Sequence, residues 1–358
     1  MVRRIFGALA GLALVATAVS AAAQPAGPRR PSPYDTAAES LARAEAAGVT
    51  VQHVKVHGKT LEGNLEGNAA DRDVLVVLPP GYAKSGARRY PVLYFLHGFA
   101  LTAQRFSDFM HAPEAVATAA RNGSDFILVM PDTDTRMGGS MYSSSPTVGD
   151  FEAFVANDLV AYVDSHYRTL ARRSSRGLAG HSMGGYGVWK IGMDYPQKWS
   201  VIYAMSACCV SPRVETVDQA RKIAEIPFDQ SAKAGFGEKA ALASAAAWSP
   251  DPKNPPYYFD FAYKDGAIDQ LVLAKWAANS PLALVPQHIW DLKSFTAIGA
   301  DVGDKDGLLG DDTAIHDELD LFGISHQWEV YDGDHVSAIT ARFPAKVLPF
   351  FASHLQMK

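Results

Sequence analysis

The chain has 358 residues, of which 48% are hydrophobic and 20% are charged. This is the ordinary composition of a soluble globular protein, with ample material for a hydrophobic core. The formal net charge of −5 argues against nucleic acid as a partner.

The first 23 residues have the pattern of a signal peptide. Arg3 and Arg4 precede an apolar run from residue 5 to 19, and three alanines stand directly before Gln24. This pattern predicts Sec-type export with cleavage after residue 23, and hence a secreted or periplasmic protein with no membrane contact after cleavage. An uncleaved membrane anchor is the alternative. Loss of the two arginines takes the net charge from −5 to −7.

Beyond residue 23 the chain divides into a short N-terminal part and one large domain. Residues 24–50 contain a Pro/Gly/Arg-rich linker and a short helix, expected over Thr36–Ala47, and the domain covers residues 51–358. Eight segments predict strands: Val51–Val56, Asp73–Leu78, Val92–Leu96, Phe126–Met130, Arg176–Ala179, Val201–Met205, Ser294–Ala300 and Gln327–Tyr331.

The later strands alternate with helical patterns, such as Phe151–His166, Gly185–Tyr195 and Thr313–Phe322. Continuous apolar strands between helices predict a mostly parallel sheet with helices on both faces, which is the α/β class. Residues 211–290 fit this alternation poorly because they combine an Ala-rich helical part with prolines and aromatics. We interpret them as an insertion.

The most informative motif is Gly180-His181-Ser182-Met183-Gly184, a G-x-S-x-G pattern between a predicted strand and a predicted helix. In this setting the motif is typical of a nucleophile elbow, in which a tight turn exposes a serine hydroxyl above the sheet. The two glycines are needed because the turn leaves no room for a Cβ on either side of Ser182.

A serine hydroxyl needs a base to take its proton. Of the five histidines after Ser182, only His335 lies in a loop directly after a strand, at the carboxyl edge of the sheet where the elbow also lies. The acid that orients the histidine is expected in the loop after the preceding strand, which offers Asp301, Asp304 and Asp306.

Two backbone N–H groups are candidates for an oxyanion hole. One belongs to Met183, directly after the serine, and the other to Phe99, in the His97-Gly98-Phe99 turn after the strand Val92–Leu96. The alternative is that the turn is only a tight connection.

The insertion is expected to lie over this edge of the sheet and to supply a substrate pocket, with Trp248, Tyr257 and Tyr258 as rigid aromatic walls. The alternative is that these aromatics only attach the insertion to the core.

The order of these segments resembles the esterase D-type family of α/β-hydrolases, which includes feruloyl and acetylxylan esterases, S-formylglutathione hydrolases and mycolyltransferase relatives. The similarity is carried by residues 77–82, 89–98, 139–142 and 167–169, by the elbow, and by the Asp-x-Gly-x-x-Asp-x-Leu-Leu pattern of residues 301–309. The resemblance implies an α/β-hydrolase fold and assigns the acid role to Asp306, with Asp304 and Asp301 in reserve.

Together with the predicted signal peptide, the resemblance implies an exported serine carboxylesterase that acts on aryl, feruloyl-like or short acyl esters, small or linked to a polysaccharide, through Ser182, His335 and Asp306. The alternatives are an acyltransferase with the same triad and a non-catalytic binding protein on a hydrolase scaffold. No cofactor is expected. No metal is expected either, because no histidine or carboxylate cluster has metal-ligand spacing along the sequence. The only cysteines, Cys208 and Cys209, are either two buried thiols or a vicinal disulfide.

Overall fold

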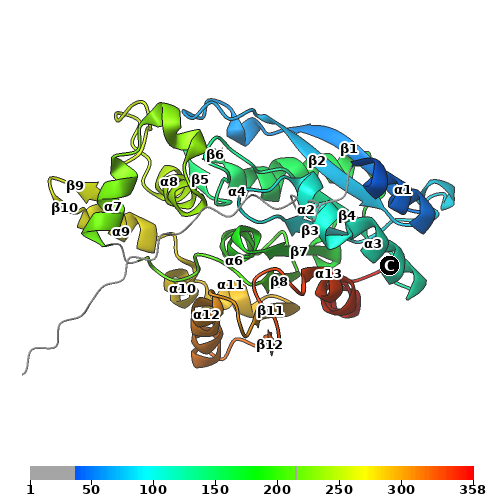
Figure 1. The fold of residues 1–358 in the computed structure, drawn as a ribbon. Helices are drawn as coiled ribbons and strands as arrows, with labels where there is room; N and C mark the ends of the chain where they lie inside the picture. The colour runs from blue at the N-terminus through cyan, green and yellow to red at the C-terminus, as the bar shows by residue number, and fades with distance from the viewer. Residues whose placement is uncertain (1–36, 214–215) are drawn as a thin grey trace, which may run out of the picture. The chain divides into compact units, whose positions relative to one another are not determined.

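Eight strands form a central sheet in the order β1-β2-β4-β3-β7-β8-β11-β12 (Figure 1). The computed structural model describes residues 37–213 and 216–358, which all belong to one compact unit. The strands are β1 (Thr50–His57), β2 (Asp71–Leu78), β3 (Val92–Leu96), β4 (Ile127–Pro131), β7 (Arg176–His181), β8 (Val201–Met205), β11 (Ala297–Gly303) and β12 (Gln327–Tyr331). The predicted signal peptide and the linker up to residue 36 lie outside the described residues.

The sheet is mostly parallel, as predicted. The six strands β4, β3, β7, β8, β11 and β12 pair in parallel with one another, whereas β2 pairs antiparallel with both β1 and β4. The carboxyl ends of β3, β7, β8, β11 and β12 therefore meet at one edge of the sheet. Loops from distant parts of the sequence come together at this edge.

One strand is shifted relative to the prediction. Residues 294–296 were expected to begin it, but they form the turn after α11 (Ile289–Lys293), where the Ser294 N–H donates to the Asp291 carbonyl. β11 consequently begins at Ala297 and extends to Gly303, so that Asp301 lies inside the strand and not in the loop after it.

Alternating side chains of the central strands face two separate helical layers. In β3, Val92, Tyr94 and Leu96 belong to one hydrophobic cluster, and Leu93 and Phe95 belong to the other. The first layer contains α4 (Phe151–Ala153), the π-helical turn Phe154–Leu159, α5 (Val160–His166), α6 (Met183–Asp194) and α12 (Leu309–Leu321). The second contains α1 (Ala37–Ala47), α2 (Ala103–Met110), α3 (Ala112–Arg121), α13 (Ile339–Arg342) and α14 (Leu348–His354). The predicted helix over Phe151–His166 is thus formed by α4, the π turn and α5.

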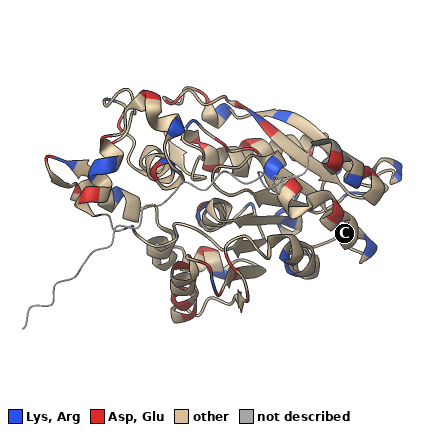
Figure 2. Cartoon of the chain, viewed as in Figure 1, with Lys and Arg blue, Asp and Glu red and all other residues tan. Residues whose placement is uncertain are grey.

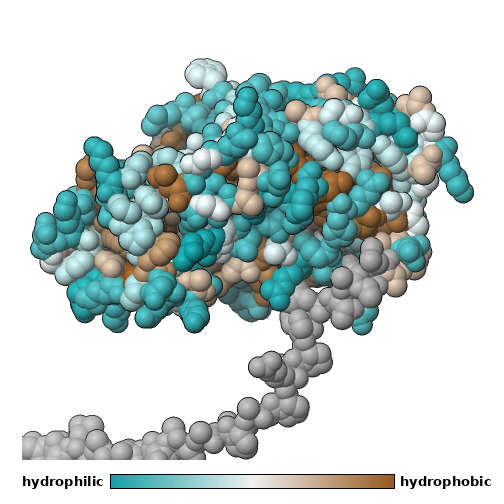
Figure 3. Space-filling model, turned by 90° about the horizontal axis from the view of Figure 1, so that it is seen from above, coloured by the Kyte–Doolittle hydropathy of each residue, from teal (hydrophilic) through white to brown (hydrophobic). Residues whose placement is uncertain are grey.

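The charge distribution agrees with this layering. β3 and β8 contain no charged residue, and Lys, Arg, Asp and Glu lie mainly on the helices and loops around them (Figure 2). Seen from above, hydrophobic residues reach the surface only in patches between hydrophilic ones (Figure 3). α1 is attached to the second layer, because Ala44 is buried there and Arg43 pairs with Glu114 of α3. No helix in the described part of the chain is both long and apolar enough to span a bilayer.

The insertion contains its own small core. It consists of α7 (Val217–Ala224), α8 (Phe236–Trp248), the hairpin of β9 (Tyr263–Lys264) and β10 (Ala267–Ile268), α9 (Gln270–Ala277), α10 (Pro281–Leu284) and α11. Tyr257 packs against the rings of Phe228, Phe259 and Phe261. Trp248 packs against Tyr186 of α6, and its indole N–H donates to the Ser143 hydroxyl at 3.0 Å. These contacts attach the insertion to the first helical layer.

α6 approaches the sheet so closely that two positions require glycine. A Cβ on Gly184 would lie 1.9 Å from the Leu96 carbonyl oxygen of β3, and a Cβ on Gly180 would lie 2.4 Å from the Gly184 carbonyl oxygen. Both obstacles are backbone atoms, which cannot move without displacing a strand or a helix. The physical reason given for the two glycines of the motif is therefore confirmed.

We expect Gly184→Ala to lower the free energy of unfolding by at least about 2 kcal/mol, because the methyl group would force α6 away from β3. Gly237→Ala is the matched control, since a Cβ at Gly237 in α8 meets no atom within 4 Å. The control should change stability by less than about 1 kcal/mol. Urea denaturation of both variants measures the difference, and equal stability of the two would contradict the close packing.

Candidate active site

Ser182 stands at the junction of β7 and α6 with a strained backbone. Its φ is 58° and its ψ is −117°, a combination that costs a non-glycine residue about 1–3 kcal/mol. Two backbone hydrogen bonds hold the turn against the end of β8 and the loop after it. The Ser182 N–H donates to the Met205 carbonyl, and the Ser182 carbonyl accepts from the Cys208 N–H, both at 3.0 Å. The serine is thus presented at the carboxyl edge of the sheet, as expected of a nucleophile elbow.

A continuous chain of hydrogen bonds leads from this serine to a buried carboxylate. Ser182 Oγ lies 2.9 Å from His335 Nε2, and His335 Nδ1 lies 2.8 Å from Asp306 Oδ2. Since a carboxylate only accepts, Nδ1 carries the proton and Nε2 presents its lone pair to the serine hydroxyl. The Asp306 side chain is almost fully buried. The structure therefore brings together the three residues that the sequence analysis selected.

The two reserve carboxylates have other partners. Asp301, inside β11, accepts from the Arg342 guanidinium at 2.7 Å and from the Tyr203 hydroxyl at 2.8 Å. Asp304 accepts from the Gly333 N–H at 3.0 Å and so supports the loop that carries His335. Of these three carboxylates, only that of Asp306 contacts the His335 imidazole.

The acid loop and the histidine loop are joined along their backbones. The Asp304 N–H donates to the Tyr331 carbonyl, and the Lys305 N–H donates to the Gly333 carbonyl. Gly303 permits this approach, because a Cβ there would lie 2.2 Å from the Gly333 carbonyl oxygen. The separation of Asp306 and His335 is thus set by backbone contacts between two loops.

His181 positions the histidine as well, a role that the sequence did not predict. The Nε2–H of His181 donates to the His335 carbonyl at 2.8 Å, and its ring stacks on Phe106. Burial, with a smaller contribution from the nearby His335, lowers the pKa of His181 to about 3, so its imidazole stays neutral. The position of His181 directly before Ser182 could have indicated this role, but the G-x-S-x-G pattern does not specify the residue at that position.

The two proposed oxyanion donors lie beside the serine. Met183 is the first residue of α6, where a helix leaves its N–H groups without intrahelical acceptors. The Phe99 turn lies against the elbow, since a Cβ on Gly98 would be 3.5 Å from Ser182 Cβ. His97 fixes that turn, because its Nδ1–H donates to the Gly98 carbonyl and its Nε2 accepts from the Thr133 N–H. Neither the Phe99 nor the Met183 N–H has a protein acceptor among the described residues.

Comparison with known proteins identifies the family of the chain. Residues 68–343 match the esterase family described as "Putative esterase". The chain belongs to this family. Its solved structural relatives have the α/β-hydrolase fold, and the mostly parallel sheet between two helical layers is the same arrangement.

The individual proteins that resemble this chain are either distant in sequence or match only part of it. Esterase Rv1288 of Mycobacterium tuberculosis (strain ATCC 25618 / H37Rv) is 38% identical over 127 residues, which are 34% of this chain and 26% of the relative. A ferulic acid esterase superposes with a TM-score of 0.62 at 22% identity, covering 86% of this chain and 98% of that one. An S-formylglutathione hydrolase from Agrobacterium tumefaciens superposes with a TM-score of 0.59 at 18% identity, covering 86% and 96%.

A pocket of about 540 Å³ opens beside Ser182. Its lining residues are Phe99, Met141, Ser182, Cys208, Cys209, Ser211, Pro212, Arg213, Phe236, Ala240, Asp306, Gly307, Leu308, Asp311 and His335. The prediction that Trp248, Tyr257 and Tyr258 form its walls is wrong, because none of them reaches it. Trp248 and Tyr257 are buried in the core of the insertion, with their polar atoms bonded to Ser143 and to the Ile226 carbonyl.

The insertion still contributes to the pocket through the beginning of α8. Phe236 is 69% exposed and meets the ring of Phe99 edge to face, with centroids 5.4 Å apart. The adjacent cysteines are both thiols and lie in the pocket wall. The hydrogen bond between the two sulfurs, and then the Arg213 cation, lower the pKa of Cys209 to about 7 against the opposing effect of burial.

The structure also brings together His316, Asp320 and His326 at donor-atom separations that could hold a metal ion. The expectation that the chain has no such cluster is therefore wrong. His316 and Asp320 are four residues apart on α12, and this spacing was the signal in the sequence. His326 is brought to them only by the turn after the helix.

We expect Asp306→Asn to lower kcat/KM for an ester by a factor on the order of 10³ or more. The amide can donate to His335 Nδ1 and would then leave the proton on Nε2, where it cannot accept from Ser182. Asp304→Asn is the control, because its side-chain oxygen can still accept from the Gly333 N–H. Its loss should stay below about tenfold. A greater loss in Asp304→Asn than in Asp306→Asn would contradict the assignment.

Proposed function

We propose that the protein is an exported serine carboxylesterase that works through a covalent acyl-enzyme. The observation that carries the proposal is the unbroken chain Ser182 Oγ–His335 Nε2 and His335 Nδ1–Asp306 Oδ2, at 2.9 and 2.8 Å, which opens into a pocket. Membership of an esterase family supports hydrolysis of carboxylic esters as the reaction.

In the first half of the reaction Ser182 Oγ attacks the ester carbonyl while His335 Nε2 takes the hydroxyl proton. The imidazolium is stabilised by the Asp306 carboxylate, which keeps its charge because it does not take up the proton. The N–H groups of Met183 and Phe99 are the donors for the oxyanion. His335 then gives the proton to the leaving alcohol, which departs and leaves an acyl group on Ser182.

In the second half a water molecule takes the place of the alcohol. His335 accepts a proton from the water as it attacks the acyl carbonyl, and returns this proton to Ser182 Oγ when the acid leaves. The same residues thus act twice, and the enzyme regains its starting protonation state.

The walls of the pocket favour an apolar or aromatic group on the substrate. Phe99, Phe236 and Met141 present hydrophobic surface, whereas Arg213 and Asp311 supply charges of opposite sign. Aromatic rings bind flat groups with little loss of side-chain freedom. Aryl, feruloyl-like and short acyl esters, free or attached to a polysaccharide, are the substrate class that we propose. A related fold occurs in the ferulic acid esterase named above.

Export is proposed from the pattern of residues 1–23, with Gln24 as the first residue of the mature protein. A secreted or periplasmic location is consistent with polymer-linked esters as substrates, because such polymers do not enter the cell.

We expect Ser182→Ala to abolish hydrolysis of p-nitrophenyl esters, because the nucleophile is lost, while circular dichroism remains unchanged. A fluorophosphonate should label the wild type at Ser182 and leave the variant unlabelled, as mass spectrometry of peptides would establish. Ser211→Ala, which removes a second serine of the same pocket, is the control and should retain activity and labelling. Activity retained in Ser182→Ala would contradict the proposal.

Phe236→Ala should reduce kcat/KM for hydroxycinnamoyl esters by about tenfold and for p-nitrophenyl acetate by less than about twofold, because we expect an acetyl group to be too short to reach this pocket residue at the start of α8. The matched control is Leu271→Ala, which removes an equally exposed side chain of the insertion that does not line the pocket. It should leave both substrates unaffected. Equal losses for both substrates in Phe236→Ala would show that this side chain does not select the acyl group.

A further inference from the structure

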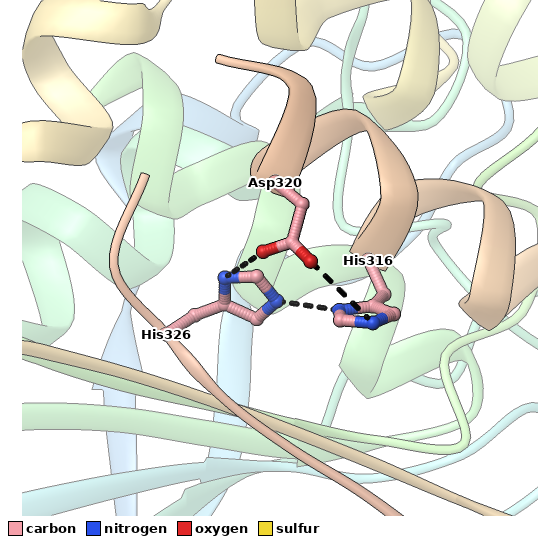
Figure 4. A group of neighbouring side chains, drawn as sticks. All are labelled: His316, Asp320 and His326. Atoms are coloured by element: carbon pink, nitrogen blue, oxygen red, sulfur yellow. Dashed lines mark hydrogen bonds and ion pairs between the residues drawn. The ribbon is translucent and has the colours of Figure 1, made fainter. Parts of the chain in front are cut away.

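His316, Asp320 and His326 form a compact cluster away from the pocket (Figure 4). His316 and Asp320 project from successive turns of α12, and His326 projects toward them from the segment that leads into β12. One donor atom from each residue can be chosen so that all three lie within 4.8 Å of one another. Two imidazoles and a carboxylate are a ligand set that suits zinc and similar divalent ions.

The two imidazoles are held in an orientation suited to metal binding. His326 Nδ1–H donates to the Ile324 carbonyl at 2.8 Å, so its Nε2 lone pair is directed at His316 Nδ1, which lies 2.7 Å away. Metal-binding histidines commonly donate their second N–H to a carbonyl in this way. The His316 ring is fixed by stacking on Trp328, with the planes 12° apart.

The burial of the three residues provides a path for an ion. The His326 side chain is 3% exposed, His316 is 23% exposed and Asp320 is 66% exposed. An ion can therefore enter from the Asp320 side and meet the buried His326 nitrogen last. The carboxylate oxygens of Asp320 lie 3.8 Å from His316 Nε2 and 3.9 Å from His326 Nδ1, which are not the two nitrogens that face each other. The exposed Asp320 side chain must therefore turn toward His316 Nδ1 and His326 Nε2 to share an ion with them.

The electrostatic surroundings favour a cation. α12 contains five acidic residues and no lysine or arginine, and it appears as a red-banded helix in Figure 2. Asp320 lies in the last turn, where the carbonyl groups at the end of the helix add partial negative charge. The acidic residues alone would not define a site, but the two oriented imidazoles supply a specific place for the ion.

We infer that His316, Asp320 and His326 bind a divalent transition-metal ion of the zinc type through His316 Nδ1, His326 Nε2 and one Asp320 carboxylate oxygen. A water molecule would complete the tetrahedron. Two nitrogens bound to zinc lie about 3.3 Å apart, so the rings must separate slightly. The proton shared between them moves through solvent from His316 Nδ1 to its Nε2, and the ion takes its place.

Such an ion would stabilise the part of the fold that carries the acid and the histidine. α12 follows the loop of Asp306, and β12 leads into the loop of His335, while the cluster ties the opposite ends of these two elements. His326 precedes β12 and thus lies at the amino edge of the sheet, whereas the pocket lies at the carboxyl edge. The inference is therefore independent of the proposed function.

Isothermal titration of the mature, EDTA-treated protein with Zn²⁺ tests the inference. We expect one ion per chain, and binding at least about tenfold weaker in His316→Ala and in Asp320→Asn. These two residues are partly exposed, so their variants should fold even where a change at buried His326 does not. His53→Ala is the matched control, because this exposed histidine of β1 lies outside the cluster, and it should bind Zn²⁺ as the wild type does.

Thermal denaturation gives a second measurement that does not depend on activity. Saturating Zn²⁺ should raise the Tm of the wild type and of His53→Ala by a few degrees, and should leave the Tm of His316→Ala unchanged. An equal rise in His316→Ala, or wild-type affinity in that variant, would place the ion elsewhere and overturn the inference. Absence of binding to the wild type at millimolar Zn²⁺ would overturn it as well.

Discussion

The close contact between α6 and the strands beneath it determines where Ser182 stands. The Gly184 backbone lies so near the Leu96 carbonyl that no side chain fits between them, and Gly180 meets Gly184 in the same way. The serine is consequently forced into a backbone conformation that is unfavourable for a non-glycine residue. Hydrogen bonds from the two peptide groups of the serine to the end of β8 and to the loop after it hold this conformation and offset its cost.

The histidine is positioned by a different means. Its loop has no comparable packing of its own, but it is joined to the acid loop by backbone hydrogen bonds and to the elbow by His181. Asp304 contributes to the same connection through the Gly333 N–H. The residues around Asp306 thus serve two purposes, since one carboxylate contacts the imidazole and another holds the backbone that carries it.

The two edges of the sheet have different chemistry. At the carboxyl edge, loops from six strands and the beginning of α8 enclose a pocket with hydrophobic walls. At the amino edge, the turn between α12 and β12 gathers two imidazoles and a carboxylate. The insertion is divided in a similar manner. Most of its aromatics form a core that attaches it to the first helical layer, and Phe236, at the start of α8, is the aromatic residue that it contributes to the pocket.

The sequence by itself determined the fold class, the elbow, Ser182 and His335, because these depend on local patterns and on chain order, whereas the choice of Asp306 among three aspartates came from the family resemblance. Strand and helix periodicity is a property of neighbouring residues, and parallel strands bring their carboxyl ends to a common edge wherever the side chains point. Only the tertiary structure decided which insertion aromatics face the pocket, that Asp301 lies inside a strand, and that His326 meets α12. Each of these depends on packing between residues that are distant in the sequence or on the course of a turn. The sequence around Trp248 and Tyr257 was equally compatible with burial in a local core and with contact to a substrate.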